Sequence, residues 1–167
     1  MSKSSITNCR SKDLLFIVLV LTLGLFSSSK ASTGSSSNPQ RSSSERNQNV
    51  KIEIKIGGKV LTATLADNAT ARDFASALPL TVSMKDLFGR EKYAALPKAL
   101  SEKGPRRHQY EVGDIAYWSP SHDLAIYYHQ DGASIPSPGI IPIAKIDAGT
   151  EAFNVSGSAK VTIDLAN

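Results

Sequence analysis

Residues 50–65 read VKIEIKIGGKVLTATL, and this stretch decides the kind of fold that the chain can adopt. Its first half alternates aliphatic with charged residues, the period-two pattern of a strand with one face in the core. Gly57-Gly58 then predicts a two-residue hairpin turn, because such turns need positive φ. With that loop the apolar residues of both strands mostly meet on one face. The predicted pairs are Ile56 with Lys59, Ile54 with Leu61, Ile52 with Ala63, and Val50 with Leu65.

The rest of the chain predicts more short strands and little helix. Alternating or apolar runs predict strands at residues 80–84, 114–119, 124–130, 140–146 and 160–165, the last with Val161, Ile163 and Leu165 inward. Pro142 restricts its strand to a sheet edge or a bulge. A capping box at residues 70–73 predicts a short helix that Pro79 ends. We expect Ser83 and Asp86 to cap a single turn and residues 89–109 to be irregular. Six or more strands with one or two short helices predict a mainly β fold, a closed or nearly closed β-barrel.

The N-terminal third predicts export rather than part of the fold. Residues 14–26, LLFIVLVLTLGLF, are uncharged, follow Lys3, Arg10 and Lys12, and precede the small-x-small run that ends at Ala31. This is the pattern of a secretory signal peptide, so we expect residues 1–31 to be removed near Ala31 and the protein to be secreted or periplasmic. The alternative is an uncleaved N-terminal membrane anchor. Residues 32–49 are Ser-rich without aliphatic residues, which predicts a disordered linker before a domain at 50–167.

Removal of the signal segment would change the charge balance and the cysteine content. The chain has 19 basic and 15 acidic residues, and residues 1–31 hold four of the basic and one of the acidic ones. The remainder has a net charge of +1, which gives no support to nucleic-acid binding. Cys9, the lone cysteine, lies inside the signal segment. The mature domain therefore has no disulfide, thiol nucleophile or thiolate metal site.

Two runs carry a family resemblance. Gly113 to Trp118 reads GDIAYW, and Leu87 to Glu91 reads LFGRE. In the context of residues 50–165, these runs resemble the small bacterial cyclophilin-like proteins of unassigned function. The resemblance implies an eight-stranded closed barrel with helices at its ends. Cyclophilin isomerases depend on a Phe-His-Arg run and a Gln-Phe-Phe run, and neither tripeptide occurs in this sequence. The resemblance therefore implies the fold and assigns no catalytic residue.

The candidate binding residues cluster around the barrel strands and their loops. Arg90 and Tyr93 follow Gly89 in the segment expected to be irregular, where polar residues beside a rigid barrel often bind ligands. Tyr117 and Trp118 are neighbours on a strand, so one is expected to point into the core and the other outward. An outward aromatic ring next to a loop can stack on a ligand, and His122 is expected at the same rim. These five residues predict a pocket at one barrel end.

Other chemistry finds little support in the sequence. His122, Asp123 and His129 do not predict a metal site, because histidines seven residues apart on one strand point to opposite faces. Adjacent Ser119 or Ser121, His122 and Asp123 rarely satisfy the geometry of a hydrolase triad. No cofactor is expected. Asn68 and Asn154 match the N-glycosylation pattern, which matters only in a eukaryotic secretory pathway.

The sequence therefore favours a non-catalytic module that binds a small molecule or an extended peptide. The alternative is a weak or divergent peptidyl-prolyl isomerase. Association with a membrane is expected only through an uncleaved signal anchor, and the sequence does not indicate an oligomeric state.

Overall fold

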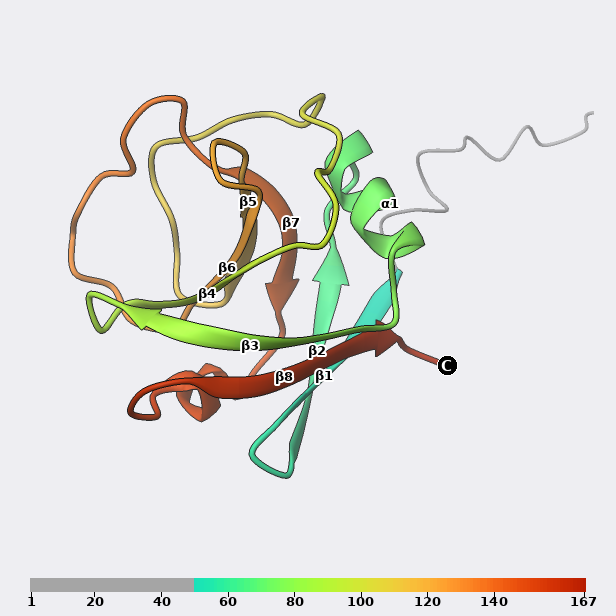
Figure 1. Cartoon of the computed structure of the whole chain (residues 1–167), viewed down its shortest axis with the longest axis vertical. Coiled ribbons are helices and arrows are strands. Elements are labelled where there is room, and N and C mark those ends of the chain that lie inside the picture. Colours follow the sequence, from blue (N-terminus) through green and yellow to red (C-terminus); the bar gives the residue numbers. More distant parts are fainter. Residues whose placement is uncertain (1–49) are drawn as a thin grey trace, which may run out of the picture. The chain divides into compact units, whose positions relative to one another are not determined.

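The computed structural model describes residues 50–167, which form eight strands, one α-helix and one 3-10 helix (Figure 1). The predicted signal segment at 1–31 and linker at 32–49 lie outside the described residues. The elements are β1 (Lys51–Ile56), β2 (Lys59–Leu65), α1 (Ala69–Ser76), β3 (Leu80–Leu87), β4 (Glu91–Ala95), β5 (Asp114–Trp118), β6 (Asp123–Tyr127), β7 (Ile141–Ile146), the 3-10 helix η1 (Thr150–Phe153) and β8 (Ala159–Leu165).

The strands close into one antiparallel barrel. Their order around it is β1-β2-β7-β5-β6-β4-β3-β8, and β8 pairs with β1 to complete the ring. Closure leaves no free sheet edge. The mainly β fold and the eight-stranded barrel implied by the family resemblance are thus confirmed.

The β1–β2 hairpin has the predicted register. Ile54 pairs with Leu61 and Ile52 with Ala63, and the amide of Leu65 donates to the carbonyl of Val50 at 2.9 Å. Gly57 and Gly58 have φ values of 55° and 79°, as expected for a tight hairpin turn.

The helix begins earlier than predicted. Its N-cap is Asn68, whose side-chain oxygen accepts from the amide of Ala71 at 2.9 Å. The predicted capping box at 70–73 is therefore wrong. Thr70 and Asp73 instead hold the loop after β4, because Thr70 Oγ1 donates to the carbonyl of Ser101 and Asp73 Oδ2 accepts from its amide.

Two predictions in the middle of the chain are also wrong. Ser83 and Asp86 belong to β3, which continues to Leu87, so the two residues do not enclose a separate turn; Asp86 Oδ1 instead accepts from the amide of Gly89 in the β3–β4 turn at 2.9 Å. The segment expected to be irregular contains β4, which pairs with both β3 and β6. The sequence did not predict β4 because the strand begins with two charged residues, Glu91 and Lys92, and both are buried.

Strand β7 lies between β2 and β5 rather than at an edge. Its proline is accommodated by a bulge, because the β5–β7 register shifts between Ile115 and Ala116, and Ala116 faces Pro142. The predicted alternative of a bulge is therefore correct.

The buried residues form an inner and an outer cluster. The inner cluster fills the barrel and includes Phe74 of α1 and Phe153 of η1. Val161 and Ile163 point into it as predicted, whereas Leu165 is exposed, which corrects the prediction for that residue. The outer cluster, on the other face of β5 and β6, consists of Tyr110, Ala116, Ala125, Tyr127, Ile135 and Ile140, with Trp118 packed against it.

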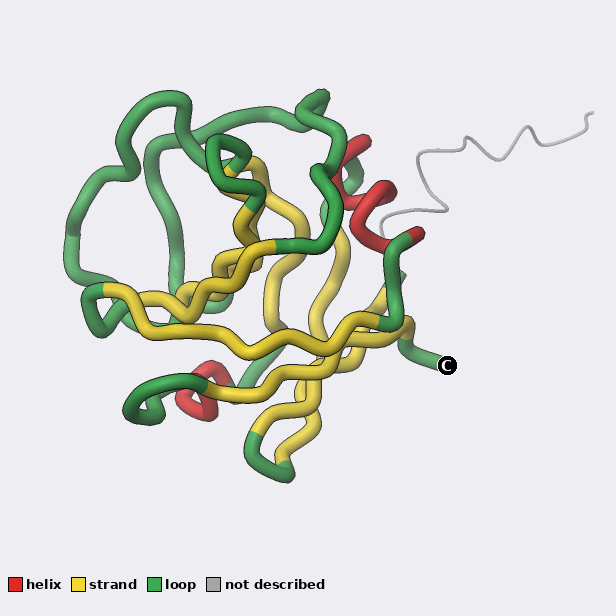
Figure 2. Tube along the Cα trace, viewed as in Figure 1, coloured by secondary structure: helices red, strands yellow, loops and turns green. Residues whose placement is uncertain are grey.

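Loops cover the outer cluster. Residues 96–113 and 128–140 are almost entirely loop and lie on the same side of the barrel as β4, β5 and β6 (Figure 2). The two loops are joined where Arg107 and Ile140 exchange backbone hydrogen bonds of 2.9 Å. No helix among residues 50–167 has the length and apolar character needed to cross a membrane.

Candidate functional site

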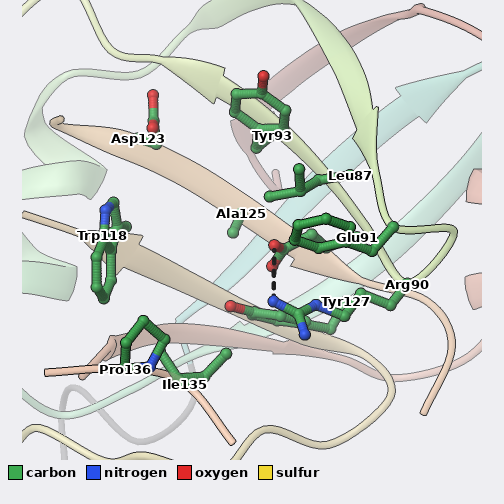
Figure 3. A pocket seen from close by; sticks show the side chains of 11 residues that line it. Leu87, Arg90, Glu91, Tyr93, Trp118, Asp123, Ala125, Tyr127, Ile135 and Pro136 are labelled. Atoms are coloured by element: carbon green, nitrogen blue, oxygen red, sulfur yellow. Dashed lines mark ion pairs between the residues drawn. The ribbon is translucent and has the colours of Figure 1, made fainter. Parts of the chain in front are cut away.

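A pocket of about 350 Å³ opens on the outer face of the barrel wall formed by β4, β6 and β5 (Figure 3). Strand alternation explains its position. Leu124 and Ile126 of β6 point into the barrel, so Asp123, Ala125 and Tyr127 point outward into the pocket. The lining residues are Leu87, Phe88, Arg90, Glu91, Tyr93, Trp118, Asp123, Ala125, Tyr127, Ile135 and Pro136.

Two stacked tyrosines lie beneath the charged part of the pocket. The rings of Tyr110 and Tyr127 are 4.3 Å apart between centroids, with an interplanar angle of 21°. The Tyr110 hydroxyl donates to Asp131, which positions the loop that supplies Ile135 and Pro136. The guanidinium of Arg90 lies 5.6 Å from the Tyr110 ring centroid and 5.2 Å from that of Phe88, within the range of cation–π contacts.

Arg90 and Glu91 place a buried ion pair in the pocket wall. Nη2 of Arg90 lies 3.6 Å from Oε1 of Glu91, and Nη1 lies 3.5 Å from Oδ2 of Asp131. Both distances exceed the 2.7–2.9 Å or so of a charge-assisted hydrogen bond. Nε of Arg90 and Oε2 of Glu91 are buried without a hydrogen-bond partner. The pair thus keeps unused hydrogen-bonding capacity.

The surroundings shift the pKa values of the acidic groups around the pair in opposite directions. Burial raises the pKa of Glu91 above its usual 4.5, although contacts with Tyr127 and Arg90 act against it. The hydrogen bond from Tyr110 lowers the pKa of Asp131 below 3.8. Burial, together with the charge of Glu91, raises the pKa of the Tyr127 hydroxyl. Tyr127 is therefore a neutral hydroxyl at physiological pH.

Phe88 stands at the edge of the pocket in an unusual conformation. It lies in the β3–β4 turn with φ 58°, a region that residues other than glycine, asparagine, aspartate and histidine rarely adopt, and 77% of its surface is exposed. Positive φ at Phe88 and Gly89 forms the β3–β4 turn but strains the backbone at Phe88, and exposing its large aromatic ring also costs free energy. Such strain is typical of residues that contact a ligand.

The structure brings together three of the five candidate residues. Arg90, Tyr93 and Trp118 line the pocket. Tyr117 points into the barrel, as expected for one member of the aromatic pair, and its hydroxyl accepts from the amide of Leu100 at 3.2 Å. His122 is exposed in the turn between β5 and β6 and does not line the pocket. The pocket that the three residues line lies on the outer wall, whereas the sequence pattern predicted a pocket at a barrel end.

The sequence-based candidates did not include the other eight lining residues, which are Leu87, Phe88, Glu91, Asp123, Ala125, Tyr127, Ile135 and Pro136. Glu91 stands beside Arg90 in the LFGRE run, which carried the only signal for it. Tyr127 follows from the alternation of β6 once Leu124 is placed inward. Ile135 and Pro136 come from a loop whose path the sequence does not specify.

Other candidate chemistry does not assemble in the described residues. Within 50–167, no three His, Cys, Asp or Glu side chains are grouped so that they could hold a metal ion. His122 and His129 lie beyond opposite ends of β6. The buried side-chain nitrogen of Asn68 donates to the carbonyl of Pro142 at 2.8 Å, so in the folded domain it is not available as a glycan acceptor. Asn154 is exposed.

One of two similar solved structures agrees with this architecture. Among solved structures, a hypothetical protein from Archaeoglobus fulgidus superposes with a TM-score of 0.58 at 22% identity, covering 73% of this chain and 98% of its own. McbB in complex with tryptophan gives a TM-score of 0.49 at 12% identity, covering 68% of this chain and 44% of its own. A search among curated proteins finds none that matches.

The family comparison covers most of the barrel. It matches residues 54–164, from within β1 to the end of β8, to the cyclophilin-like family. With the eight-stranded closed barrel, this match shows that the chain belongs to the cyclophilin-like family.

Proposed function

We propose that the domain is a binding module that holds a small molecule or a short extended peptide in the pocket on β4, β5 and β6. The observation that carries the proposal is the buried Arg90–Glu91 pair with two unpartnered polar atoms in an aromatic pocket. Small-molecule sites have this composition, mostly apolar and aromatic walls with a few polar groups that orient the ligand. The volume of about 350 Å³ is near the lower end for such sites.

The position of the pocket favours binding to a largely preformed site. Two lining strands, β4 and β6, are paired on both sides in the closed barrel, and so is β5, which carries Trp118. Side chains on such strands are more precisely held than side chains on loops. Phe88 and Arg90 come from the β3–β4 turn and Ile135 and Pro136 from a loop, where adjustment to a ligand costs less.

The test is ligand-induced thermal stabilisation across a library of small molecules and short peptides. Ligands that stabilise the wild-type chain are expected to lose their effect in Trp118→Ala and Arg90→Ala. His122→Ala is the matched control, because this exposed residue lies outside the pocket. Circular dichroism verifies that each variant is folded. Unchanged stabilisation in folded Trp118→Ala and Arg90→Ala protein would show that the ligand binds elsewhere.

A weak prolyl isomerase is the alternative, and the observation in its favour is an arginine beside an apolar pocket on this fold. Arg90 is compensated by Glu91 on one side and by Asp131 on the other, which weakens it as a donor to a prolyl nitrogen. A protease-coupled assay with several proline peptides separates the two functions. A rate above background that disappears in Arg90→Ala would establish the isomerase.

The proposal includes export. The predicted signal segment at 1–31 and the linker at 32–49 would deliver the domain to a secreted or periplasmic location, and an uncleaved segment would instead tether it to the membrane. Mass spectrometry of the N-terminus of protein from cell fractions tests this. A mature chain that begins near residue 32 supports cleavage, and an intact chain in the soluble intracellular fraction contradicts export.

A further inference from the structure

The pocket wall contains one unpartnered donor and one unpartnered acceptor on adjacent residues. Arg90 Nε is an N–H donor and Glu91 Oε2 is an acceptor, and both atoms are buried. The two side chains are 10% and 6% exposed. Figure 3 shows the guanidinium of Arg90 and the carboxylate of Glu91 pointing toward one another beside the Tyr127 ring. The two groups contact each other, and Glu91 also hydrogen-bonds Tyr127, but buried polar atoms left without a hydrogen-bond partner are costly in folded proteins.

Other buried charges of the described domain are well satisfied. Lys92 donates to Asp86 and to two backbone carbonyls. Asp114 accepts from Arg107, from Lys145 and from the amide of Glu111. The one other unpartnered atom in the described residues is Nε of Arg107, whose side chain is 37% exposed and does not line the pocket. Unused capacity in a well-buried pair is therefore a property of the pocket.

The signs of the charges restrict the ligand. An anion that approached Arg90 would also meet Glu91 and Asp131, and a cation that approached Glu91 would meet Arg90. A hydrocarbon would leave both polar atoms without a partner. A neutral group with an acceptor next to a donor satisfies both atoms without placing like charges together.

We propose that the pocket recognises the backbone amide groups of one extended residue, whose carbonyl oxygen accepts from Arg90 and whose own N–H donates to Glu91, because these two groups lie on the same side of an extended residue. This inference rests on the proposed function and names the ligand class for the same site. It also separates the domain from a protein that selects X-Pro bonds, because the amide before a proline has no N–H.

The walls select the groups on either side of the amide. Leu87, Ile135 and Pro136 are aliphatic, and Phe88, Tyr93, Trp118 and Tyr127 are aromatic. A single apolar or aromatic side chain beside the amide would fill much of a pocket of about 350 Å³. The preferred ligand is therefore a capped apolar amino acid or one such residue of an extended peptide.

Trp118, the only tryptophan of the chain, reports directly on occupancy. The probe is N-acetyl-phenylalanine methylamide, titrated into the full chain and followed by tryptophan fluorescence. Its diester analogue, in which an oxygen replaces each amide N–H, keeps the shape and both carbonyls but has no donor. We expect the diamide to bind with a saturable signal and the diester to bind at least about tenfold more weakly, as for a lost hydrogen bond to a carboxylate. Phenethylamine and phenylacetate, the cationic and anionic probes, are also expected to bind more weakly than the diamide.

Two variants test whether Glu91 causes the preference for the diamide over the diester. Glu91→Ala is expected to reduce the diamide-to-diester ratio toward one, whereas Glu111→Ala, an exposed carboxylate that does not line the pocket, should leave it unchanged. If Glu91→Ala does not fold, the two probes on wild-type protein still decide. Equal affinities for both, or tighter binding of a charged probe, would overturn amide recognition and leave the proposed binding function intact. If no probe changes Trp118 fluorescence, the inference fails, and the library screen with Trp118→Ala and Arg90→Ala decides the proposed function separately.

Discussion

The Nζ atom of Lys92 lies 2.9 Å from Oδ2 of Asp86, and the lysine side chain has no solvent exposure. Nζ also donates to the backbone carbonyls of Val155 and Gly157, in the loop that leads into β8. The Tyr128 hydroxyl donates to the same carboxylate. One buried cation thus connects β4 to β3 and to the segment that closes the barrel.

Lys92→Met is therefore expected to destabilise the domain by about 3 kcal/mol, the lower end for breaking a buried ion pair. The lower end applies because Asp86 is 31% exposed and water can hydrate its charge after the change. Lys51→Met is the matched control. Lys51 lies 2.8 Å from Asp147 but is 45% exposed, so its loss should cost at most about 1 kcal/mol. Urea denaturation measures both, and equal losses would contradict the role assigned to Lys92.

Glu91 and Asp86 should give stability opposite dependences on pH. Burial raises the pKa of Glu91 in the folded state, so the folded protein holds a proton that the unfolded chain releases. Stability is therefore lost as pH rises from about 4.5 through the folded-state value. Glu91→Gln removes this loss, and its stability relative to wild type should increase as pH rises through that window. The variant also loses the charge that faces Arg90, which shifts its free energy of unfolding by a similar amount at each pH and leaves the trend with pH unchanged.

Asp86→Asn provides the contrasting case. Hydrogen bonds from Tyr128 and then Lys92 lower the pKa of Asp86 below 3.8, so its contribution is present above that value and lost as pH falls. The variant should be destabilised at neutral pH and approach wild type in acid. Urea denaturation of both variants from pH 3 to 8 measures these trends. A difference between Glu91→Gln and wild type that does not change with pH would contradict the burial argument.

Phe88→Asn should stabilise the domain and weaken the pocket. Asparagine adopts positive φ more readily than phenylalanine, so the change should gain about 0.5–1 kcal/mol from backbone relief. Loss of the aromatic ring at the pocket edge should lower ligand affinity. His122→Asn is the control, because His122 has the same φ of 58° but lies outside the pocket. It should gain less, since histidine tolerates this region better, and should keep ligand affinity. Loss of stability in Phe88→Asn would show that the strain is absent.

Tyr117→Phe should lower the stability of the domain without changing the affinity of the pocket for its ligand. The change leaves the buried amide of Leu100 without its acceptor, which should cost about 1–3 kcal/mol. Ligand affinity should not change, because Tyr117 points into the barrel while its neighbour Trp118 points outward. Thermal unfolding with and without N-acetyl-phenylalanine methylamide measures both effects. A loss of affinity without a loss of stability would show that Tyr117 contributes to the binding site.

Local patterns predicted those parts of the fold that have a single local solution. The β1–β2 hairpin is one, because only a Gly57-Gly58 loop brings the apolar residues of both strands to one face. Strand β4 is the opposite case. Its sequence EKYAA begins with two charged residues, and the burial of these two depends on Asp86 and Tyr127, which other strands supply. Long-range contacts also explain why the N-cap of the helix was predicted at the wrong residue. Thr70 and Asp73 form hydrogen bonds with Ser101 in a distant loop, and Asn68 caps the helix instead.

The candidate site was predictable to the extent that strand alternation and nearby glycines indicate it. Tyr117 and Trp118 had to point in opposite directions, but the sequence alone does not say which one faces outward. Register decides this, because Trp118 pairs with Asp123 on the outer face while Tyr117 pairs with Leu124 in the core. The contribution of Ile135 and Pro136 depends on the path of a loop, which backbone pairing between Arg107 and Ile140 determines.

The most direct test of the account is a nitrogen-15 NMR titration of the full chain with N-acetyl-phenylalanine methylamide. The indole N–H of Trp118 gives one resonance, because the chain has one tryptophan. We predict a saturable shift of this resonance together with the backbone amides of Arg90, Ala125 and Ile135, which approach the pocket from separate segments. Shifts confined to the groove between α1 and residues 96–100, with the Trp118 indole unchanged, would contradict a ligand site on the outer wall of the barrel.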